Sequence, residues 1–113
     1  MFPLAYQQSF NLDSIFASLA DPTRRDILRR LADGEQTIGA VAEHYHLTFA
    51  AISKHIQLLE RAKLVVKRRQ GKRQYVALAP GAFASAADYL DWYRRLWVER
   101  FDSLDDYLTN NPE

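Results

Sequence analysis

The sequence contains no cysteine among its 113 residues. Disulfide bonds, thiolate metal sites and cysteine nucleophiles are therefore excluded. The chain has no uninterrupted apolar run approaching the roughly 20 residues that a membrane-spanning helix needs. Its opening segment, residues 1–8, also lacks the basic start of a secretory signal. We therefore expect a cytoplasmic protein of bacterial type with no membrane partner.

Glycine is also scarce, with four residues in all, whereas 48% of the chain is hydrophobic. This length and composition suffice for one compact domain and leave little for a second, so we expect a single domain over residues 1–113. The net charge of only +1 argues against a wholly basic nucleic-acid coat protein. The charge is nevertheless uneven. Residues 61–75 carry seven basic side chains and no acid (+7), and residues 88–113 carry seven acids against three arginines (−4).

Two amphipathic helices are predicted over residues 11–32. The first covers residues 11–19, where apolar side chains recur at helical spacing. Asp21 can then cap the second helix by accepting hydrogen bonds from free backbone amides. Pro22 suits the first helical position because it has no amide to satisfy. The second helix is expected to end near Ala32.

A helix-turn-helix is predicted over residues 37–62. Thr37 is placed to cap a short helix that continues to about Tyr45, and Thr48 to cap a longer helix that ends near Ala62. The longer helix has one apolar face for the core and a largely polar opposite face. Two helices joined by a tight turn follow from this pattern.

A two-stranded β-ribbon is predicted over residues 64–78. Its two halves, residues 64–69 and 73–78, are rich in β-formers, and Gly71 between them readily adopts the positive φ of a hairpin turn. A long final helix is predicted over residues 84–109, where apolar residues recur every three or four positions. The expected fold class is mainly α with a two-stranded β-wing. It is a winged helix-turn-helix in which four helices precede the strands and a fifth follows them.

The polar face of the helix at residues 48–62 suits the reading of DNA, because an α-helix fits the major groove of B-DNA. Gln57 can pair with adenine, Lys54 with guanine or phosphate, and Ser53 with several base edges. The alternative is the solvated face of an ordinary helix, which this face alone does not exclude. The candidate DNA-reading residues are Thr48, Phe49, Ala50, Ser53, Lys54, His55 and Gln57.

The basic ribbon that follows points to the same surface. A basic hairpin beside a recognition helix can lie along the DNA backbone or insert an arginine into a narrow minor groove. A charge run is more often a solubilising face, but seven basic residues without an acid in fifteen are dense for that role. Binding through phosphates should weaken steeply with salt. The candidate wing contacts are Lys67, Arg68, Arg69, Gln70, Lys72, Arg73 and Tyr75.

The aromatic residues of the final helix exceed what one small core needs, which indicates a subunit interface. A two-fold dimer would place two recognition helices about one DNA turn apart, roughly 34 to 36 Å, and predicts a palindromic operator. An inducer pocket between the subunits is an alternative use of the same residues. The candidate interface residues of the final helix are Tyr89, Trp92, Tyr93, Leu96, Trp97, Phe101, Leu104 and Leu108.

The three histidines do not define a metal or catalytic site. His44 and His46 are two residues apart, so a shared metal would need the helix to end between them, and two imidazoles do not close a zinc shell. We interpret them as polar residues at a helix end. His55 and Ser53 do not face each other on a helix and lack an oxyanion site, so no nucleophile pair is expected. Two roles remain open for His55: contact with DNA, or support of the recognition helix.

Several segments resemble the ArsR-type (ArsR/SmtB) winged-helix repressors. Residues 19–25, Leu-Ala-Asp-Pro-Thr-Arg-Arg, are similar to the family's opening signature, and the resemblance continues through residues 52–56 and 62–65. It covers about residues 12–108. The resemblance implies a homodimer built from the first and last helices, recognition by the helix that carries Ser53, Lys54 and His55, and repression relieved by a ligand or a metal. The interface residues that it implies in the first helix are Leu12, Ile15, Phe16 and Leu19.

The metal-sensing part of that resemblance does not carry over. Metal-sensing members have a cysteine motif where residues 38–42 here read Ile-Gly-Ala-Val-Ala, and no histidine occurs between Asp88 and Glu113. The tail, with Trp92 and Trp97 among its aromatic residues, is similar to members that lack recognised metal sites.

The sequence therefore predicts a DNA-binding transcriptional regulator that recognises specific double-stranded sites. We expect a homodimeric repressor on a palindromic operator, with no metal and no cofactor. One alternative is a ligand- or metal-responsive sensor with an unconventional site at the dimer interface, which leaves an unidentified small-molecule inducer open. A winged-helix protein-interaction module is another, and the basic wing disfavours it. No carboxylate pair, or nucleophile with its base, has the spacing of an enzyme site.

Overall fold

The fold is that of a computed structural model that describes residues 12–110. The start of the predicted first helix, at residue 11, lies outside the described residues. The chain divides into two compact units, the first ending at Phe83 and the second starting at Ala84. Each unit is described by itself.

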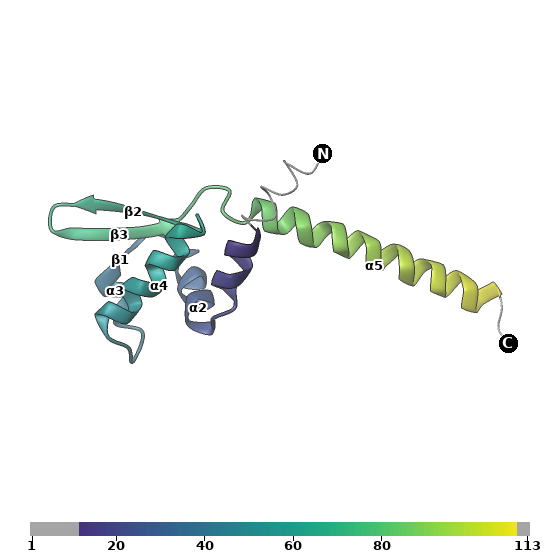
Figure 1. The fold of residues 1–113 in the computed structure, drawn as a ribbon, viewed down its shortest axis with the longest axis horizontal. Coiled ribbons are helices and arrows are strands. Elements are labelled where there is room, and N and C mark those ends of the chain that lie inside the picture. Colours follow the sequence, from purple (N-terminus) through teal and green to yellow (C-terminus); the bar gives the residue numbers. More distant parts are fainter. Residues whose placement is uncertain (1–11, 111–113) are drawn as a thin grey trace. The chain divides into compact units, whose positions relative to one another are not determined.

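The first unit opens with helices that begin where the sequence places their caps (Figure 1). A first helix covers residues 12–19 and is followed by α2 (Pro22–Leu31). Asp21 Oδ2 accepts the backbone amide of Arg24 at 3.0 Å, so the predicted N-cap is confirmed. Pro22 occupies the first turn, where it leaves no amide unpaired.

The predicted helix-turn-helix consists of α3 (Ile38–Ala42) and α4 (Phe49–Arg61). Thr37 Oγ1 caps α3 by accepting the amide of Ala40 at 3.1 Å, and Thr48 Oγ1 caps α4 by accepting the amide of Ala51 at 3.0 Å. The expected continuation of the short helix to Tyr45 is wrong. The helix ends at Ala42, and the chain then turns toward α4.

The wing has three strands, not the two that were predicted. The hairpin strands β2 (Val65–Gln70) and β3 (Arg73–Leu78) pair antiparallel, and β1 (Gln36–Thr37) pairs with the other edge of β3 to give the order β1-β3-β2. This extra strand lies between α2 and α3 in the chain. Its two residues are too few to leave a period-2 pattern in the sequence.

The junction between α4 and the wing is a tight helix stop. Lys63 adopts a left-handed conformation with φ 61°. Its amide donates to Glu60 O at 2.9 Å, and the amide of Leu64 donates to Leu59 O at 3.0 Å. These two bonds form a Schellman motif, which usually has glycine at the left-handed position. At the far end of the hairpin, Gly71 has the predicted positive φ, 62°.

The helices α2, α3 and α4 pack together against the small sheet (Figure 1). The core of this unit contains several large apolar side chains that are fully buried. They are Ile15, Ile27, Val41, Ile52, Ile56, Leu59 and Leu64. Ile15 was a candidate for the dimer interface, and that assignment is wrong, because a side chain that is 0% exposed within one subunit has no surface left for a partner.

Tyr45 ties the turn between α3 and α4 to α2. Its hydroxyl donates to Asp26 Oδ2 at 2.6 Å, and Arg30 Nε donates to the same oxygen at 3.0 Å. These hydrogen bonds, that of Tyr45 first, lower the pKa of Asp26. Burial raises the pKa of Tyr45, so its phenol stays protonated at neutral pH and remains a donor.

Tyr45→Phe is expected to lower the free energy of unfolding by about 1 to 2 kcal/mol at neutral pH, since it removes a hydrogen bond to a charged acceptor. The pKa of Asp26 is lower in the folded chain than in the unfolded chain, so this stabilisation is present at neutral pH and disappears as the pH falls through the folded-state pKa. Urea unfolding of both proteins at several pH values is the measurement. A difference that stays constant into the acid range would contradict the role given to Asp26.

The second unit is a single long helix, α5 (Ala84–Asn110), close to the bounds predicted for it. Ala86 is the buried residue of this helix. The large apolar side chains of α5 lie mostly on the surface of the single subunit: Trp92 is 54% exposed, Trp97 55% and Phe101 62%. No helix among residues 12–110 combines the length and the apolar character that a membrane crossing requires.

Candidate nucleic-acid interface

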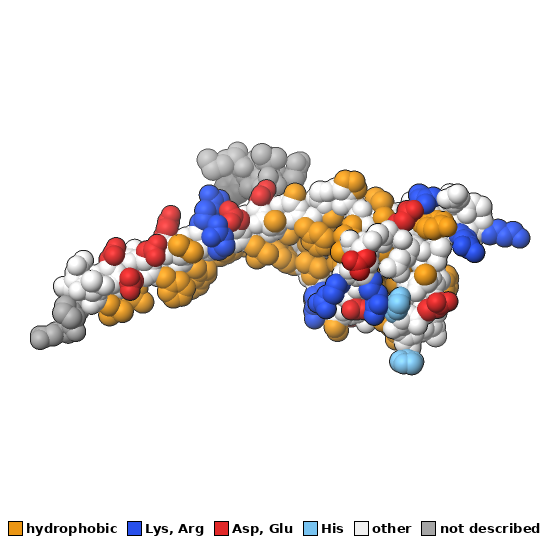
Figure 2. All heavy atoms as spheres, turned by 180° about the vertical axis from the view of Figure 1, so that it is seen from behind, with side chains coloured by type: hydrophobic (Ala, Val, Ile, Leu, Met, Phe, Trp, Pro, Cys, Tyr) orange, Lys and Arg blue, Asp and Glu red, His pale blue; other side chains and the backbone are white. Residues whose placement is uncertain are grey.

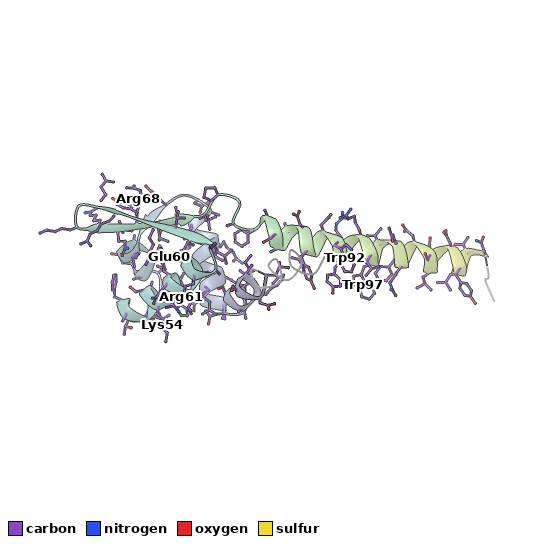
Figure 3. All side chains as sticks on the ribbon, turned by 45° about the horizontal axis from the view of Figure 1, so that its top comes forward. Lys54, Glu60, Arg61, Arg68, Trp92 and Trp97 are labelled. Carbon is purple, nitrogen blue, oxygen red and sulfur yellow. The ribbon has the colours of Figure 1, made fainter. Side chains whose placement is uncertain are left out.

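The polar face of α4 is exposed, as the sequence predicts. The apolar residues Ile52, Ile56 and Leu59 are fully buried on the opposite face of the helix. Lys54 and Arg61 project from α4 in Figure 3. Of the candidate DNA-reading residues, Ser53 and His55 are half-buried, and those that are exposed are Thr48, Phe49, Ala50, Lys54 and Gln57.

His55 is held against the start of α2. Its Nδ1 lies 3.3 Å from Arg24 Nη1 and 3.9 Å from Asp21 Oδ2, and its side chain is 22% exposed. Of the two roles that the sequence leaves open, this geometry favours support of the recognition helix over contact with DNA.

Two cations of the wing are already paired within the fold. Lys67 Nζ lies 3.2 Å from Glu60 Oε1 of α4. Arg68 binds both carboxylate oxygens of Glu35, with a distance of 3.0 Å from Nε to Oε2. This contact lowers the pKa of Glu35 and raises that of Arg68.

Two further wing candidates also hold the Arg68 guanidinium. Its Nη1 donates to Gln70 Oε1 at 2.8 Å, and its carbon lies 4.4 Å from the centre of the Tyr75 ring. Four of the seven wing candidates, Lys67, Arg68, Gln70 and Tyr75, are therefore engaged with one another or with nearby acids. Their availability for DNA is reduced accordingly.

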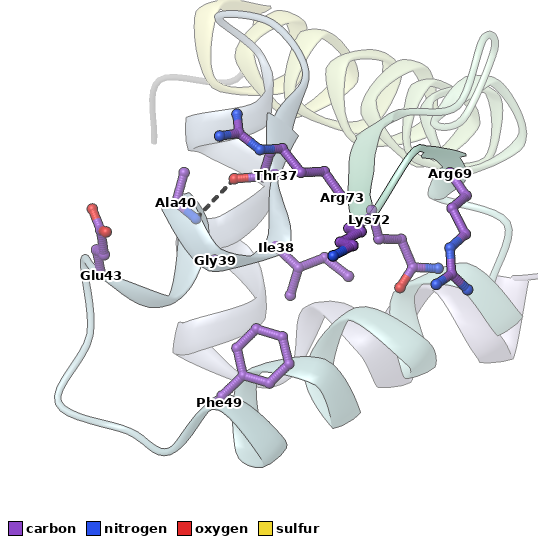
Figure 4. Close-up of a pocket in the computed structure, with 10 residues that line it drawn as sticks. Thr37, Ile38, Gly39, Ala40, Glu43, Phe49, Arg69, Lys72 and Arg73 are labelled. Carbon is purple, nitrogen blue, oxygen red and sulfur yellow. Dashed lines mark hydrogen bonds between the residues drawn. The ribbon is translucent and has the colours of Figure 1, made fainter.

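The remaining wing cations are Arg69, Lys72 and Arg73, which are exposed and form no ion pair within residues 12–110. Arg69 Nε contacts the carbonyl of Gly71 at 3.4 Å. These three side chains line a groove of about 570 Å³ whose opposite wall includes Phe49, which is 59% exposed. Figure 4 shows the groove between the start of α3, the start of α4 and the wing tip.

The groove combines an apolar floor with a cationic wall. Phe49 supplies the exposed apolar side, and the wing tip supplies the positive charge. Glu43 is the acidic residue among the lining side chains. A surface of this composition fits a chain of apolar sugars and anionic phosphates.

The remaining histidines, expected at a helix end, lie in the turn between α3 and α4. His44 and His46 are both exposed. Within residues 12–110, no three histidine, aspartate or glutamate side chains cluster closely enough to hold a metal ion.

Apolar side chains gather along one side of α5 (Figure 2). Tyr89 and Tyr93 meet edge to face with ring centres 5.0 Å apart, and Trp92 meets Tyr93 in the same way at 4.8 Å. Trp97 lies 5.9 Å from Phe101. The interface candidates of α5 therefore form one stripe, from which Leu96 alone is half-buried. Leu12, Phe16 and Leu19 of the first helix are also half-buried.

A helix-turn-helix followed by a β-hairpin with free cations at its tip defines the winged helix-turn-helix class of DNA-binding proteins. Residues 19–68 match the model of the Helix-turn-helix domain family. The chain is 36% identical to the transcriptional repressor SdpR of Bacillus subtilis over 67 residues, which make up 59% of this chain and 74% of that protein.

Solved structures agree with this class. The crystal structure of an ArsR family transcriptional regulator superimposes with a TM-score of 0.74 at 31% identity, over 79% of this chain and 92% of that one. The solution structure of the homodimeric winged helix-turn-helix DNA-binding domain of a possible ArsR-family regulator from Mycobacterium bovis gives a TM-score of 0.60 at 28% identity, over 82% and 85% of the two chains. The protein belongs to the ArsR family of winged helix-turn-helix transcriptional regulators, which are DNA-binding proteins and not enzymes.

Proposed function

We propose that the protein is a homodimeric transcriptional repressor that binds a palindromic operator with α4 in the major groove and the wing tip on the DNA backbone. The observation that carries this proposal is the position of the unpaired cations. Arg69, Lys72 and Arg73 line the same groove as Phe49 at the start of α4. One surface thus offers both base-reading side chains and free positive charge.

The groove is proposed as the binding site of the sugar–phosphate backbone of DNA. Phe49 would pack against a deoxyribose, and the wing-tip cations would neutralise the adjacent phosphates. With the backbone held there, Ser53, Lys54 and Gln57 would face base edges one or two turns farther along α4.

The aromatic stripe of α5 is proposed as the dimer interface. Exposed tryptophan and phenylalanine side chains in one line are typical of an interface core, where aromatic residues are enriched. The similar domain from Mycobacterium bovis is homodimeric. A two-fold arrangement would present two copies of α4 to successive major grooves and would account for a palindromic site.

Repression without a metal switch is proposed from the relatives and from the donor set. The similar protein of Bacillus subtilis is named a repressor. The chain offers no cysteine ligand, and the two histidines in the turn between α3 and α4 are exposed and lack further ligands among residues 12–110. Binding to bacterial DNA would require a cytoplasmic protein.

The base-reading role is tested with Ser53→Ala and Gln57→Ala. Each is expected to weaken binding to the operator by roughly 1 to 3 kcal/mol for each lost base contact. Binding to a scrambled duplex of the same length should stay unchanged, because phosphate contacts set that affinity. Fluorescence anisotropy titrations on both duplexes measure the ratio. Equal discrimination by variant and wild type would remove these residues from the reading surface.

A further inference from the structure

Arg24 of α2 links the end of the first helix to the middle of α4. Its Nε donates to Ser18 O at 2.7 Å, and its Nη2 donates to Ala17 O at 3.1 Å. Its Nη1 lies 3.3 Å from His55 Nδ1. One guanidinium therefore connects three helices through three of its nitrogens.

The two carbonyls that Arg24 binds belong to the last turn of the first helix, and that of Ala17 also accepts the backbone amide of Ala20 at 3.3 Å. Ser18 is 6% exposed, whereas Ala17 beside it is exposed. A planar guanidinium can serve two carbonyls and a third acceptor at once, because its donors point in fixed and different directions. A lysine ammonium is a single point of charge and cannot span the same set.

Asp21 also contacts both Arg24 and His55. It accepts the backbone amide of Arg24 at 3.0 Å, and its Oδ2 lies 3.9 Å from His55 Nδ1. The ring of His55 is thus confined between the cap of α2 and the Arg24 guanidinium. His55 lies on α4 next to Lys54. Because a rotation of α4 about its axis would carry His55 away from Arg24, this contact opposes such a rotation.

Arg25 provides a natural comparison. Its Nη1 donates to Leu19 O at 2.7 Å. It therefore caps the same end of the first helix as Arg24, but no hydrogen bond or ion pair joins it to α4 among the described residues. Arg24 is half-buried, binds two carbonyls and reaches His55, whereas Arg25 is exposed and binds one carbonyl.

We propose that Arg24 is a positioning residue that, through His55, fixes the orientation of α4 relative to the first helix. The coupling transmits the packing of the first helix to the DNA-reading face. This inference rests on the proposed function, since it assigns Arg24 a role in sequence discrimination and not in phosphate binding. Arg24 itself is half-buried and does not line the wing groove.

The test compares Arg24→Gln, His55→Ala and the double variant with Arg25→Gln as the matched control. Arg24→Gln is expected to lower the ratio of operator to scrambled-DNA affinity about tenfold. The affinity for scrambled DNA and the salt slope should stay at the wild-type values. His55→Ala should cause a similar loss, and the double variant should lose no more than either single variant, because both remove one link. Arg25→Gln should leave the ratio within about twofold of wild type.

Circular dichroism and urea unfolding establish that the variants are folded. If Arg24→Gln does not fold, His55→Ala carries the test alone, since it leaves both carbonyl contacts of Arg24 intact. Unchanged discrimination in the folded variants, additive losses in the double variant, or an equal loss in Arg25→Gln would overturn the positioning role. A wild-type protein that does not discriminate at all would instead contradict the proposed function, so the two failures are distinguishable.

Discussion

Replacing Arg69 and Arg73 together by alanine is expected to weaken binding to every DNA sequence and to flatten its salt dependence. Each lost phosphate contact changes the slope of log affinity against log salt by about 0.9, so two contacts reduce its steepness by about 1.8. At 0.15 M salt this corresponds to roughly a thirtyfold loss of affinity. Operator and scrambled duplexes should lose equally, because phosphates carry no sequence information.

The paired cations of the same wing are the matched controls for this experiment. Lys67 is neutralised by Glu60 and Arg68 by Glu35, so Lys67→Ala and Arg68→Ala should leave the salt slope nearly unchanged. Titrations at four or more salt concentrations give the slopes. The role given to the wing tip fails if the Arg69 and Arg73 variant keeps the wild-type slope, or if the controls flatten it as much.

Trp97→Asp is expected to convert the dimer to a monomer. Trp97 is 55% exposed in the single subunit, and a buried aromatic anchor contributes about 2 kcal/mol or more to an interface. An unpaired carboxylate in its place adds a desolvation penalty of several kcal/mol. Together these effects raise the dimer dissociation constant by about three orders of magnitude or more. Light scattering should then report half the wild-type mass at micromolar concentration.

Val98→Asp is the control for that substitution. Val98 is also apolar and 46% exposed, and it follows Trp97 directly in α5. One residue corresponds to about 100° around a helix, so Val98 lies at the edge of the stripe, beside Phe101 and about 100° from Trp97. We expect Val98→Asp to remain dimeric. A Trp97→Asp protein with unchanged mass would exclude the stripe as the interface, as would equal dissociation of both variants.

The caps and the hairpin turn could be predicted because their chemistry is local. Asp21, Thr37 and Thr48 each accept an amide three residues farther along the chain, and such bonds follow from residue type and spacing alone. Gly71 marks the turn for the same reason, since positive φ suits glycine.

The features that were missed depend on contacts between distant segments. β1 is a strand only because β3 offers it an edge. The pairing of Arg68 with Glu35 joins residues 33 positions apart, so no spacing rule finds it. The pairing of Lys67 with a residue of α4 could have been anticipated in part. Lys67 is two residues from the buried Val65, and alternate strand residues share a face, which turns it toward α4.

Ile15 shows the corresponding limit for the dimer interface. Helical spacing places it on one face with Leu12 and Leu19, but it does not say whether that face meets the subunit's own core or a partner. The structure buries Ile15 completely and leaves the other two half-buried. In α5 the same kind of pattern leaves Trp97 and Phe101 exposed. The amphipathic pattern predicts a buried face, and only the tertiary packing tells whose surface covers it.

The central claim, that a dimer of this chain reads specific double-stranded DNA through α4, is tested most directly by selecting bound duplexes from a pool of random sequence. The account predicts enrichment of an inverted repeat whose half-site centres are about 10 base pairs apart, or a whole number of helical turns apart. It also predicts two subunits bound to each selected duplex. A bound pool with no motif beyond that of the input would contradict it.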